Sequence, residues 1–205
     1  RAWGAPQPED LRIWEYDLDP DVFRGYNPFC AVNILHDRLF IEYDKTDMTT
    51  YLNRRGCVFC DGAGAFAAAG DIPTQLAEAK QRVAFKGGEK FIAYFQSYTN
   101  TYAPVEFLQE AFTQAINRPD IVALSIATRP DCLPHETLDL LEKLNKIKPV
   151  WVELGLQTAN EKTAEYIRRC YKNEIYEKAV NDLTARGIEV ITHLIIGLPK
   201  ETKAD

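Results

Sequence analysis

The hydrophobic positions of this chain follow two alternating patterns, and the alternation is most regular after residue 90. Short, nearly continuous apolar runs are separated by longer stretches in which apolar residues recur every three or four positions. The runs are typical of buried strands, and the longer stretches are typical of amphipathic helices. Strands are predicted over residues 91–95, 121–126, 150–157 and 188–196, with helices between them. This succession indicates an α/β fold in which helices cover a parallel sheet.

Local residue choices predict where these helices begin and end. Thr74 is the predicted N-cap of a helix that runs to about residue 85, and Thr158 with Glu161 forms a capping-box pattern. Gly187 stands where a C-terminal cap belongs. The residues predicted to face the sheet are Phe107, Leu108, Ala111, Phe112, Ala115 and Ile116 in one helix, Leu138, Leu141 and Leu144 in the next, and Ile175, Ala179, Val180 and Leu183 in a later one.

The beginning of the chain has a weaker pattern. Residues 1–33 contain prolines and aromatic residues without a sustained period, and we interpret them as an irregular N-terminal arm. An apolar run predicts a strand over 34–43, which polar residues follow. The predicted organisation is therefore an arm over 1–33 and a strand-and-helix domain over 34–205.

Composition narrows the class of protein. The chain has 205 residues, a formal charge of −6 and five cysteines. This charge argues against a protein that coats nucleic acid broadly, although a local basic patch remains compatible with it. The sequence contains no apolar run of membrane-spanning length, so no membrane partner is expected. An odd, unevenly spaced set of cysteines is a poor disulfide framework and fits ligand thiols in a reducing cytoplasm.

Polar residues gather where the predicted strands end. In parallel α/β barrels the chemistry lies at the carboxyl ends of the strands, because all of these ends meet at one rim. Side chains from different strands are therefore expected to converge on a binding site. The residues concerned are Gln96, Thr99, Asn100 and Thr101, then Ser125, Thr128 and Arg129, then Glu153 and Gln157, and finally His193 and Gly197.

A pair of cysteines precedes this region. Cys57 and Cys60 are two residues apart in a loop flanked by Gly56 and Gly62, so both sulfur atoms can turn toward one metal centre. Structural zinc, redox dithiols and iron–sulfur clusters all use this spacing, and the pair alone does not distinguish them.

Five segments in order resemble a bacterial radical S-adenosylmethionine (SAM) family that is related to the catalytic subunit of Elongator and is poorly characterised in function. The resemblance runs from residue 54 to residue 202, and residues 1–53 do not share it. The segments are Arg-Gly-Cys-Val-Phe-Cys (55–60), Ile-Ala-Tyr-Phe-Gln-Ser-Tyr-Thr-Asn-Thr-Tyr-Ala-Pro (92–104), Leu-Ser-Ile-Ala-Thr-Arg-Pro-Asp-Cys-Leu-Pro (124–134), Trp-Val-Glu-Leu-Gly-Leu-Gln-Thr (151–158) and His-Leu-Ile-Ile-Gly-Leu-Pro (193–199).

The resemblance implies a partial (β/α) TIM-like barrel that holds a [4Fe–4S] cluster on three cysteine thiolates. The fourth iron would bind SAM, and reductive cleavage of SAM would give a 5′-deoxyadenosyl radical. An electron donor such as flavodoxin or ferredoxin would be needed, and kinship with Elongator suggests tRNA as the unknown substrate. The family continues beyond the strand at 188–196, so the chain is expected to be a fragment or to have its barrel completed by another element.

The resemblance also assigns residues. Cys57 and Cys60 match the second and third cluster ligands, and Phe59 matches an aromatic position whose backbone would face the adenine. The first ligand would fall near Lys45, where there is no cysteine. Cys30 is the alternative ligand, and it requires a long but entropically tolerable loop over 31–56. The other interpretation is a degenerate cluster site. The residues expected to bind SAM are Phe59 and all the polar strand-end residues given above, Gln96 to Gly197.

Several residues keep a second interpretation. Glu153 either contacts the cofactor or forms a salt bridge with Arg129, and His193 is either a ligand contact or a core histidine. Cys132 is expected to be a buried small residue. Residues 168–172 are expected to form a solvated basic helix end, and the resemblance to the Elongator subunit implies an RNA contact as the alternative. Gly87-Gly88-Glu89 precedes its strand and is predicted to make a turn. For the whole chain, the alternatives to a radical SAM enzyme are a zinc-binding module and a barrel scaffold without a cluster.

Overall fold

A parallel sheet of five strands forms the centre of the protein. The computed structural model describes residues 37–41, 71–96 and 99–202. The strands lie side by side in chain order, and every neighbouring pair is parallel. Their bounds are Asp37–Ile41 for β1, Phe91–Phe95 for β2, Ile121–Thr128 for β3, Val150–Gln157 for β4 and Glu189–Leu194 for β5.

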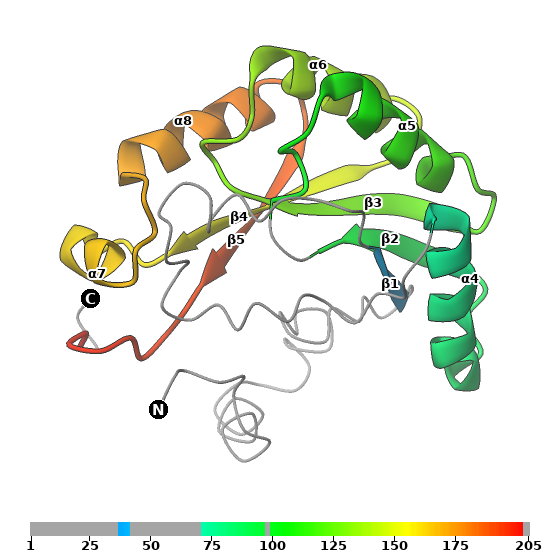
Figure 1. The fold of residues 1–205 in the computed structure, drawn as a ribbon, viewed down its shortest axis with the longest axis horizontal. Helices are drawn as coiled ribbons and strands as arrows, with labels where there is room; N and C mark the ends of the chain where they lie inside the picture. The colour runs from blue at the N-terminus through cyan, green and yellow to red at the C-terminus, as the bar shows by residue number, and fades with distance from the viewer. Residues whose placement is uncertain (1–36, 42–70, 97–98, 203–205) are drawn as a thin grey trace.

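Helices connect the strands and lie outside the sheet. Figure 1 shows α5, α6 and α8 arched over one face, with α4 beside the β1 edge. Strands in chain order with helices on one side are the arrangement of a (β/α) barrel, because a doubly wound sheet would reverse its strand order and carry helices on both faces. The predicted partial TIM-like barrel is confirmed. The helices are α4 (Ile72–Val83), η1 (Ala84–Lys86, a 3-10 turn), α5 (Val105–Ile116), α6 (His135–Asn145), α7 (Glu161–Tyr166) and α8 (Asn173–Thr184).

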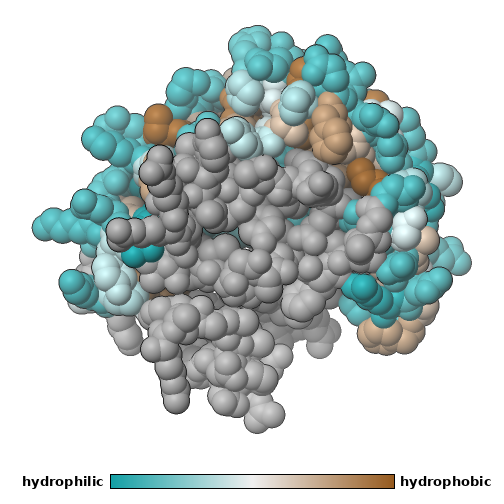
Figure 2. Space-filling view, in the orientation of Figure 1, coloured by the Kyte–Doolittle hydropathy of each residue, from teal (hydrophilic) through white to brown (hydrophobic). Residues whose placement is uncertain are grey.

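The core lies between the sheet and these helices. Side chains alternate between the two faces of a strand, and Phe95, Ile126 and Leu154 point toward the helices. Phe95 packs edge-on against Phe112 of α5, with the ring centroids 4.8 Å apart. The outer surface of the helices visible in Figure 2 is mainly hydrophilic, with a few hydrophobic residues between. The polar side chains described below lie on the opposite face of the sheet, which points away from these helices.

Most predicted elements are confirmed, with corrections at their ends. The N-cap of α4 is Asp71 and not Thr74, because the Asp71 carboxylate accepts a hydrogen bond from the Thr74 amide at 2.9 Å. The capping box at Thr158 is wrong as well, since Asn160 caps α7 by accepting from the amides of its first turn. Gly187 adopts the left-handed conformation expected after a helix (φ 70°). Phe107 and Ile175 were predicted to be buried, but they are 44% and 40% exposed.

Some predictions fall outside the described residues. The strand predicted over 34–43 is confirmed where the structure describes it, as β1. The predicted arm over 1–33, and Cys30, Cys57, Phe59 and Cys60, lie outside the described ranges. Within those ranges, no helix has the length and apolar character needed to cross a membrane.

Candidate functional site

The face of the sheet that points away from the helices carries a buried carboxylate near its centre. Glu153 of β4 is 2% exposed and binds side chains from three neighbouring strands. Its Oε2 atom accepts from the Tyr94 hydroxyl of β2 at 2.7 Å and lies 2.6 Å from Nε2 of His193 on β5. The Ser125 hydroxyl of β3 donates to Oε1. One side chain from each of four consecutive strands therefore meets in what we call the Glu153 cluster.

This arrangement fixes the chemistry of its members. An ionised carboxylate inside a protein is stable only when hydrogen bonds or a counter-charge replace its water, and Glu153 has three such partners. If Glu153 is ionised, its oxygen can only accept, and this geometry then assigns the proton of a neutral His193 ring to Nε2 and leaves Nδ1 as an acceptor. The His193 side chain is 32% exposed, and the core interpretation of this residue is therefore wrong.

The predicted alternative of a Glu153–Arg129 salt bridge is also wrong. Arg129 forms a two-pronged ion pair with Asp131, through Nε to Oδ1 at 2.9 Å and Nη2 to Oδ2 at 2.7 Å. Burial lowers the pKa of the Arg129 guanidinium, but the hydrogen bonds and charge of Asp131 outweigh burial and raise this pKa overall. Burial raises the pKa of the neighbouring Cys132 thiol to about 12, as expected of a structural cysteine.

The loop after β2 is attached to the end of β3. Asn100 donates from its backbone amide and its side chain to the Ala127 carbonyl, at 3.2 and 2.8 Å. The hydroxyls of Thr101 and Thr128 lie 2.6 Å apart, and Thr101 also donates to the Cys132 carbonyl. These predicted ligand residues therefore bind one another and build the rim of the sheet.

Thr99 differs from its neighbours in this loop. Its hydroxyl oxygen is buried and has no hydrogen-bond partner within the part of the chain that the structure describes. A buried hydroxyl without a partner is costly, and such a group at a strand end fits a site that receives a polar ligand. Thr99 is thus a predicted site residue whose surroundings fit the prediction.

The end of β4 has an unusual backbone. Gln157 adopts a left-handed conformation (φ 65°), and its carbonyl accepts from the Ile195 amide after β5 at 2.9 Å. The Gln157 side chain folds back over Gly155, where a Cβ atom would overlap with its amide group. Gly197 also has a positive φ of 83° and open space around its Cα. Gln96 is half-buried at the end of β2.

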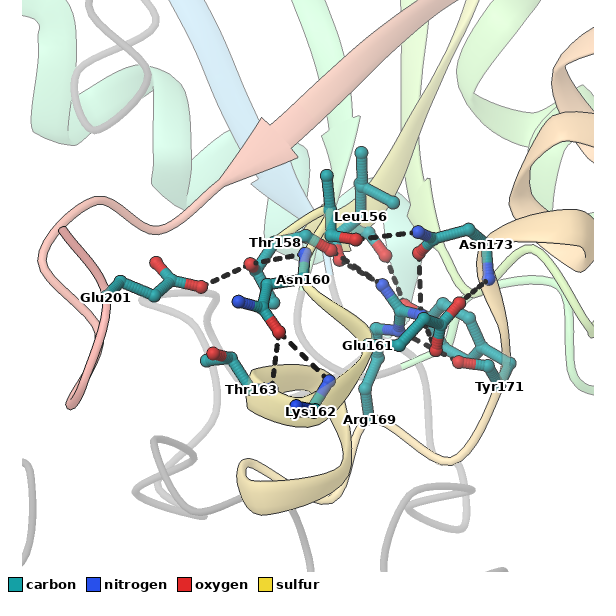
Figure 3. Close-up of polar contacts among 12 residues, drawn as sticks. Leu156, Thr158, Asn160, Glu161, Lys162, Thr163, Arg169, Tyr171, Asn173 and Glu201 are labelled. Atoms are coloured by element: carbon teal, nitrogen blue, oxygen red, sulfur yellow. Dashed lines mark hydrogen bonds and ion pairs between the residues drawn. The ribbon is translucent and has the colours of Figure 1, made fainter. Parts of the chain in front are cut away.

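A buried arginine organises the segment that follows β4. Arg169 is 1% exposed, and Figure 3 shows its guanidinium surrounded by acceptors. The prediction of a solvated basic helix end is therefore wrong for this residue. The acceptors are the carbonyls of Leu156 at 3.0 Å, Thr158 at 2.8 Å and Tyr171 at 2.9 Å, and the side chains of Asn173 at 2.9 Å and Glu161 at 3.5 Å.

Tyr171 links this arginine to the rest of the rim. Its ring contacts the guanidinium groups of both Arg129 and Arg169, each 4.9 Å from the centroid, and its hydroxyl donates to the Gly155 carbonyl. Thr158 donates in turn to Glu201, beyond β5. The ends of β3, β4 and β5 are thus joined by direct contacts.

Sequence reasoning missed three residues of this site. Tyr94 sits within the apolar run of β2, and only its pairing opposite Ser125 shows that both point to the face of Glu153. Arg169 and Tyr171 belong to the basic run 168–172, whose composition predicts a solvated helix end because such runs are usually exposed. As for metals, the described residues contain no group of three or more His, Cys, Asp or Glu side chains that could hold an ion.

The comparisons with known proteins decide the family. A model of the radical SAM superfamily matches residues 52–205, which is most of the chain and includes Cys57 and Cys60. The chain belongs to the radical SAM superfamily. Membership supports the general activity of this superfamily, which is cleavage of SAM at an iron–sulfur cluster, and with it the enzyme class.

Two curated proteins illustrate what this chain is similar to. It is 47% identical over 153 residues to the uncharacterized protein YtqA of Bacillus subtilis, an alignment that covers 72% of this chain and 48% of YtqA. The chain thus spans about half the length of this curated relative. A shorter similarity, 36% over 78 residues, joins 38% of the chain to 14% of a tRNA uridine(34) acetyltransferase of Methanocaldococcus jannaschii.

A solved structure supports the fold independently. The Elp3 protein of Methanocaldococcus infernus, in a form with an N-terminal deletion, superposes with a TM-score of 0.57 over 80% of this chain and 39% of its own. The sequence identity is 19%, so this likeness concerns the fold. Together with the superfamily match, it confirms that the chain is a radical SAM protein whose fold resembles that of Elp3.

Proposed function

We propose that this chain binds SAM at the carboxyl ends of β2–β5, next to a [4Fe–4S] cluster held by Cys30, Cys57 and Cys60. The superfamily match over residues 52–205 carries this proposal, because it includes the Cys57–Cys60 pair and the strands whose polar ends form the rim. When bound together, cluster and SAM supply reductive cleavage to methionine and a 5′-deoxyadenosyl radical.

The contacts of the rim divide its residues into two groups. Asn100, Thr101, Thr128 and Arg129 bind other protein groups and fix the loops. Thr99 and His193 fit a polar ligand, since Thr99 has a buried hydroxyl without a partner among the described residues and His193 has a half-buried ring. Their polar atoms would orient the amino, carboxylate or ribose groups of SAM.

Two further rim residues serve the same ligand by different means. Gly197 leaves space in which a ligand can approach the backbone, because no atom of the described residues beyond its chain neighbours lies within 4 Å of the position that a Cβ atom would occupy. Gln157 would present its amide at the end of β4, while the hydroxyls of Ser125 and Tyr94 donate to the Glu153 carboxylate and hold it in place. The binding role of these residues, with that of Gln96 and Phe59, is part of the proposal.

The three cysteines differ in how strongly they are supported as cluster ligands. Cys57 and Cys60 fall inside the superfamily match, and Cys30 falls outside it. In the resembling family the first strand precedes the first ligand, whereas β1 follows Cys30 in this chain. Cys30 is kept because it is the one cysteine between residue 1 and Cys57, and a long intervening loop adds little closure entropy.

The proposed substrate is a tRNA, and the proposed electron donor is a flavodoxin or ferredoxin in the cytoplasm. The similarity to a tRNA uridine(34) acetyltransferase supports the substrate class. With a net charge of −6, RNA binding would depend on a local basic surface, and raised salt would weaken it.

Anaerobic purification followed by iron, sulfide and zinc analysis tests this proposal. About four irons and four sulfides per chain are expected, and they should be lost in Cys57→Ala and Cys60→Ala but kept in the control Cys170→Ala, whose thiol is exposed. One tightly bound zinc would instead favour a zinc module, and no metal would favour a scaffold. A Cys30→Ala protein that keeps the full cluster would remove Cys30 from the ligand set.

A further inference from the structure

Arg169 uses every hydrogen-bond donor that an arginine has. A guanidinium group carries five N–H bonds in a rigid fork. Nε donates to Tyr171, Nη1 donates to Leu156 and Thr158, and Nη2 faces Asn173 and Glu161. The side chain is also 1% exposed, so water does not replace these partners. Such a site is specific for arginine, because a lysine ammonium has three donors that spread from a single point.

Two of these acceptors flank one residue. Nη1 of Arg169 holds the carbonyl of Leu156 and the carbonyl of Thr158, and Gln157 lies between them. Figure 3 shows both carbonyls directed at the guanidinium from the end of β4. The arginine therefore fixes the peptide groups around Gln157, whose own carbonyl binds the Ile195 amide of the neighbouring segment.

The backbone held in this way is strained. Four non-glycine residues in the described ranges have a positive φ, and three of them are Gln157, Arg168 and Cys170. The last two stand directly before and after Arg169. Left-handed conformations are unfavourable for side chains of this size and persist when their surroundings fix them, and such residues cluster at functional sites. Here the guanidinium and its acceptors supply that constraint.

We propose that Arg169 is a positioning residue, which keeps Gln157 in its left-handed conformation and so sets the shape of the β4–β5 rim for SAM. This inference rests on the proposed function. Arg169 touches no ligand itself, since it is enclosed by protein groups. It acts through Gln157, through the bond from Ile195 to the Gln157 carbonyl, and through Tyr171, which contacts both Arg129 and Gly155.

The experiment replaces Arg169 by lysine in the full chain with its cluster, and Arg186→Lys serves as the matched control. Arg186 is also hydrogen-bonded, although it is less deeply buried than Arg169; it lies just beyond α8 and contacts Asp139 and Asp182. We expect amide hydrogen exchange at Ile195 to accelerate at least tenfold in R169K, and the dissociation constant for SAM to rise about tenfold or more. R186K should change neither quantity.

Variants of Gln157 provide the same test with Arg169 left in place. Valine disfavours a positive φ and glycine tolerates it, so Q157V should accelerate exchange at Ile195 whereas Q157G should keep it slow. Q157N keeps an amide and tolerates the left-handed region better than glutamine, so it should partly restore exchange protection and SAM binding in the R169K background. If R169K fails to fold, Q157V and Q157G still test the proposal, because wild-type SAM affinity in a folded Q157V protein would show that the left-handed backbone held by Arg169 does not shape the site.

The outcomes separate the two proposals. Faster exchange at Ile195 in R169K and Q157V, in a protein whose wild type does not bind SAM, would leave the backbone role standing and overturn the proposed function. Unchanged exchange at Ile195 would overturn the proposed role of Arg169, whatever the measured affinity for SAM. Faster exchange with wild-type SAM affinity would also overturn it, because the held backbone would then have no effect on the site.

Discussion

Two buried charges on or beside β4 are stabilised in opposite ways. Glu153 is an anion held by donors from β2, β3 and β5, which lie 59, 28 and 40 residues away in the sequence. Arg169 is a cation held by acceptors that lie 2 to 13 residues away. The anion is therefore stabilised only when the sheet has assembled, whereas the cation is stabilised by its own segment of chain.

This difference separates two tasks in the site. The Glu153 cluster spans the inner face and sets which polar atoms the sheet presents. The contacts of Arg169 set the shape of the backbone that ends β4. Breaking either set of contacts is expected to lower the free energy of unfolding, and breaking the contacts of Arg169 should also loosen the loop that contains them.

The largest expected effect is on stability in Arg169→Met. Methionine keeps most of the volume but leaves buried carbonyls without a donor, which should lower the free energy of unfolding by roughly 3–5 kcal/mol. Urea denaturation of the full chain measures this, with Arg186→Met as the control at about 1 kcal/mol. A loss in R169M no larger than that in R186M would show that the Arg169 contacts add little.

Glu153 variants should have the next largest effect. Glu153→Ala leaves the Tyr94 and Ser125 hydroxyls buried without their acceptor and should cost about 2–4 kcal/mol, whereas Glu153→Gln keeps one acceptor oxygen and should cost about 1 kcal/mol. The same denaturation experiment compares the two. Equal losses would mean that the negative charge, and not the hydrogen-bond geometry, stabilises the cluster.

The ring of His193 should be protonated at Nε2 in its neutral form, because this atom faces the Glu153 oxygen. The chain has three histidines, so 15N NMR of the imidazole groups can be assigned with His36→Gln and His135→Gln controls. We expect the Nε2–H tautomer at His193, and its loss in E153A. An Nδ1–H tautomer in the wild type would contradict the geometry of the cluster.

The smallest expected effect on stability at neutral pH concerns two thiols, which should differ in reactivity. Cys132 is buried with its pKa raised to about 12, and Cys170 is exposed. Only thiolates alkylate, so iodoacetamide at pH 8 should label Cys170 at least a hundredfold faster, as read by peptide mass spectrometry. A raised folded-state pKa stabilises the protein below about pH 9, and this contribution should disappear as the pH rises toward 12. Comparison with Cys132→Ala isolates it.

The contrast between Glu153 and Arg169 also shows which features of this protein could be predicted from its sequence. Period-two and period-3.6 patterns predicted the strands, the helices and the rim, because burial depends on which face a residue occupies. The same parity places Ser125, Glu153 and His193 on one face. Tyr94 escaped because its neighbours in β2 are all apolar, and the register with β3 was needed to align it with Ser125.

The helix caps and the burial of Arg169 were harder to predict from the sequence. Asp71 and Thr74 are both good N-caps, and the choice depends on where the helix starts, with Pro73 in the first turn favouring Asp71. The choice between Thr158 and Asn160 likewise depends on where α7 starts. Asn160 is its N-cap, and Thr158 donates to Glu201 instead. The burial of Arg169 goes with a left-handed backbone at both flanking residues, a feature that the identities of Arg168 and Cys170 do not suggest.

The most direct measurement is the formation of 5′-deoxyadenosine when the anaerobic, cluster-loaded protein is reduced in the presence of SAM. The account predicts 5′-deoxyadenosine and methionine in equal amounts from the wild type and from Cys170→Ala, and neither product from Cys57→Ala or Cys60→Ala. A wild-type protein that carries a reducible cluster and binds SAM, yet forms no 5′-deoxyadenosine, would contradict it.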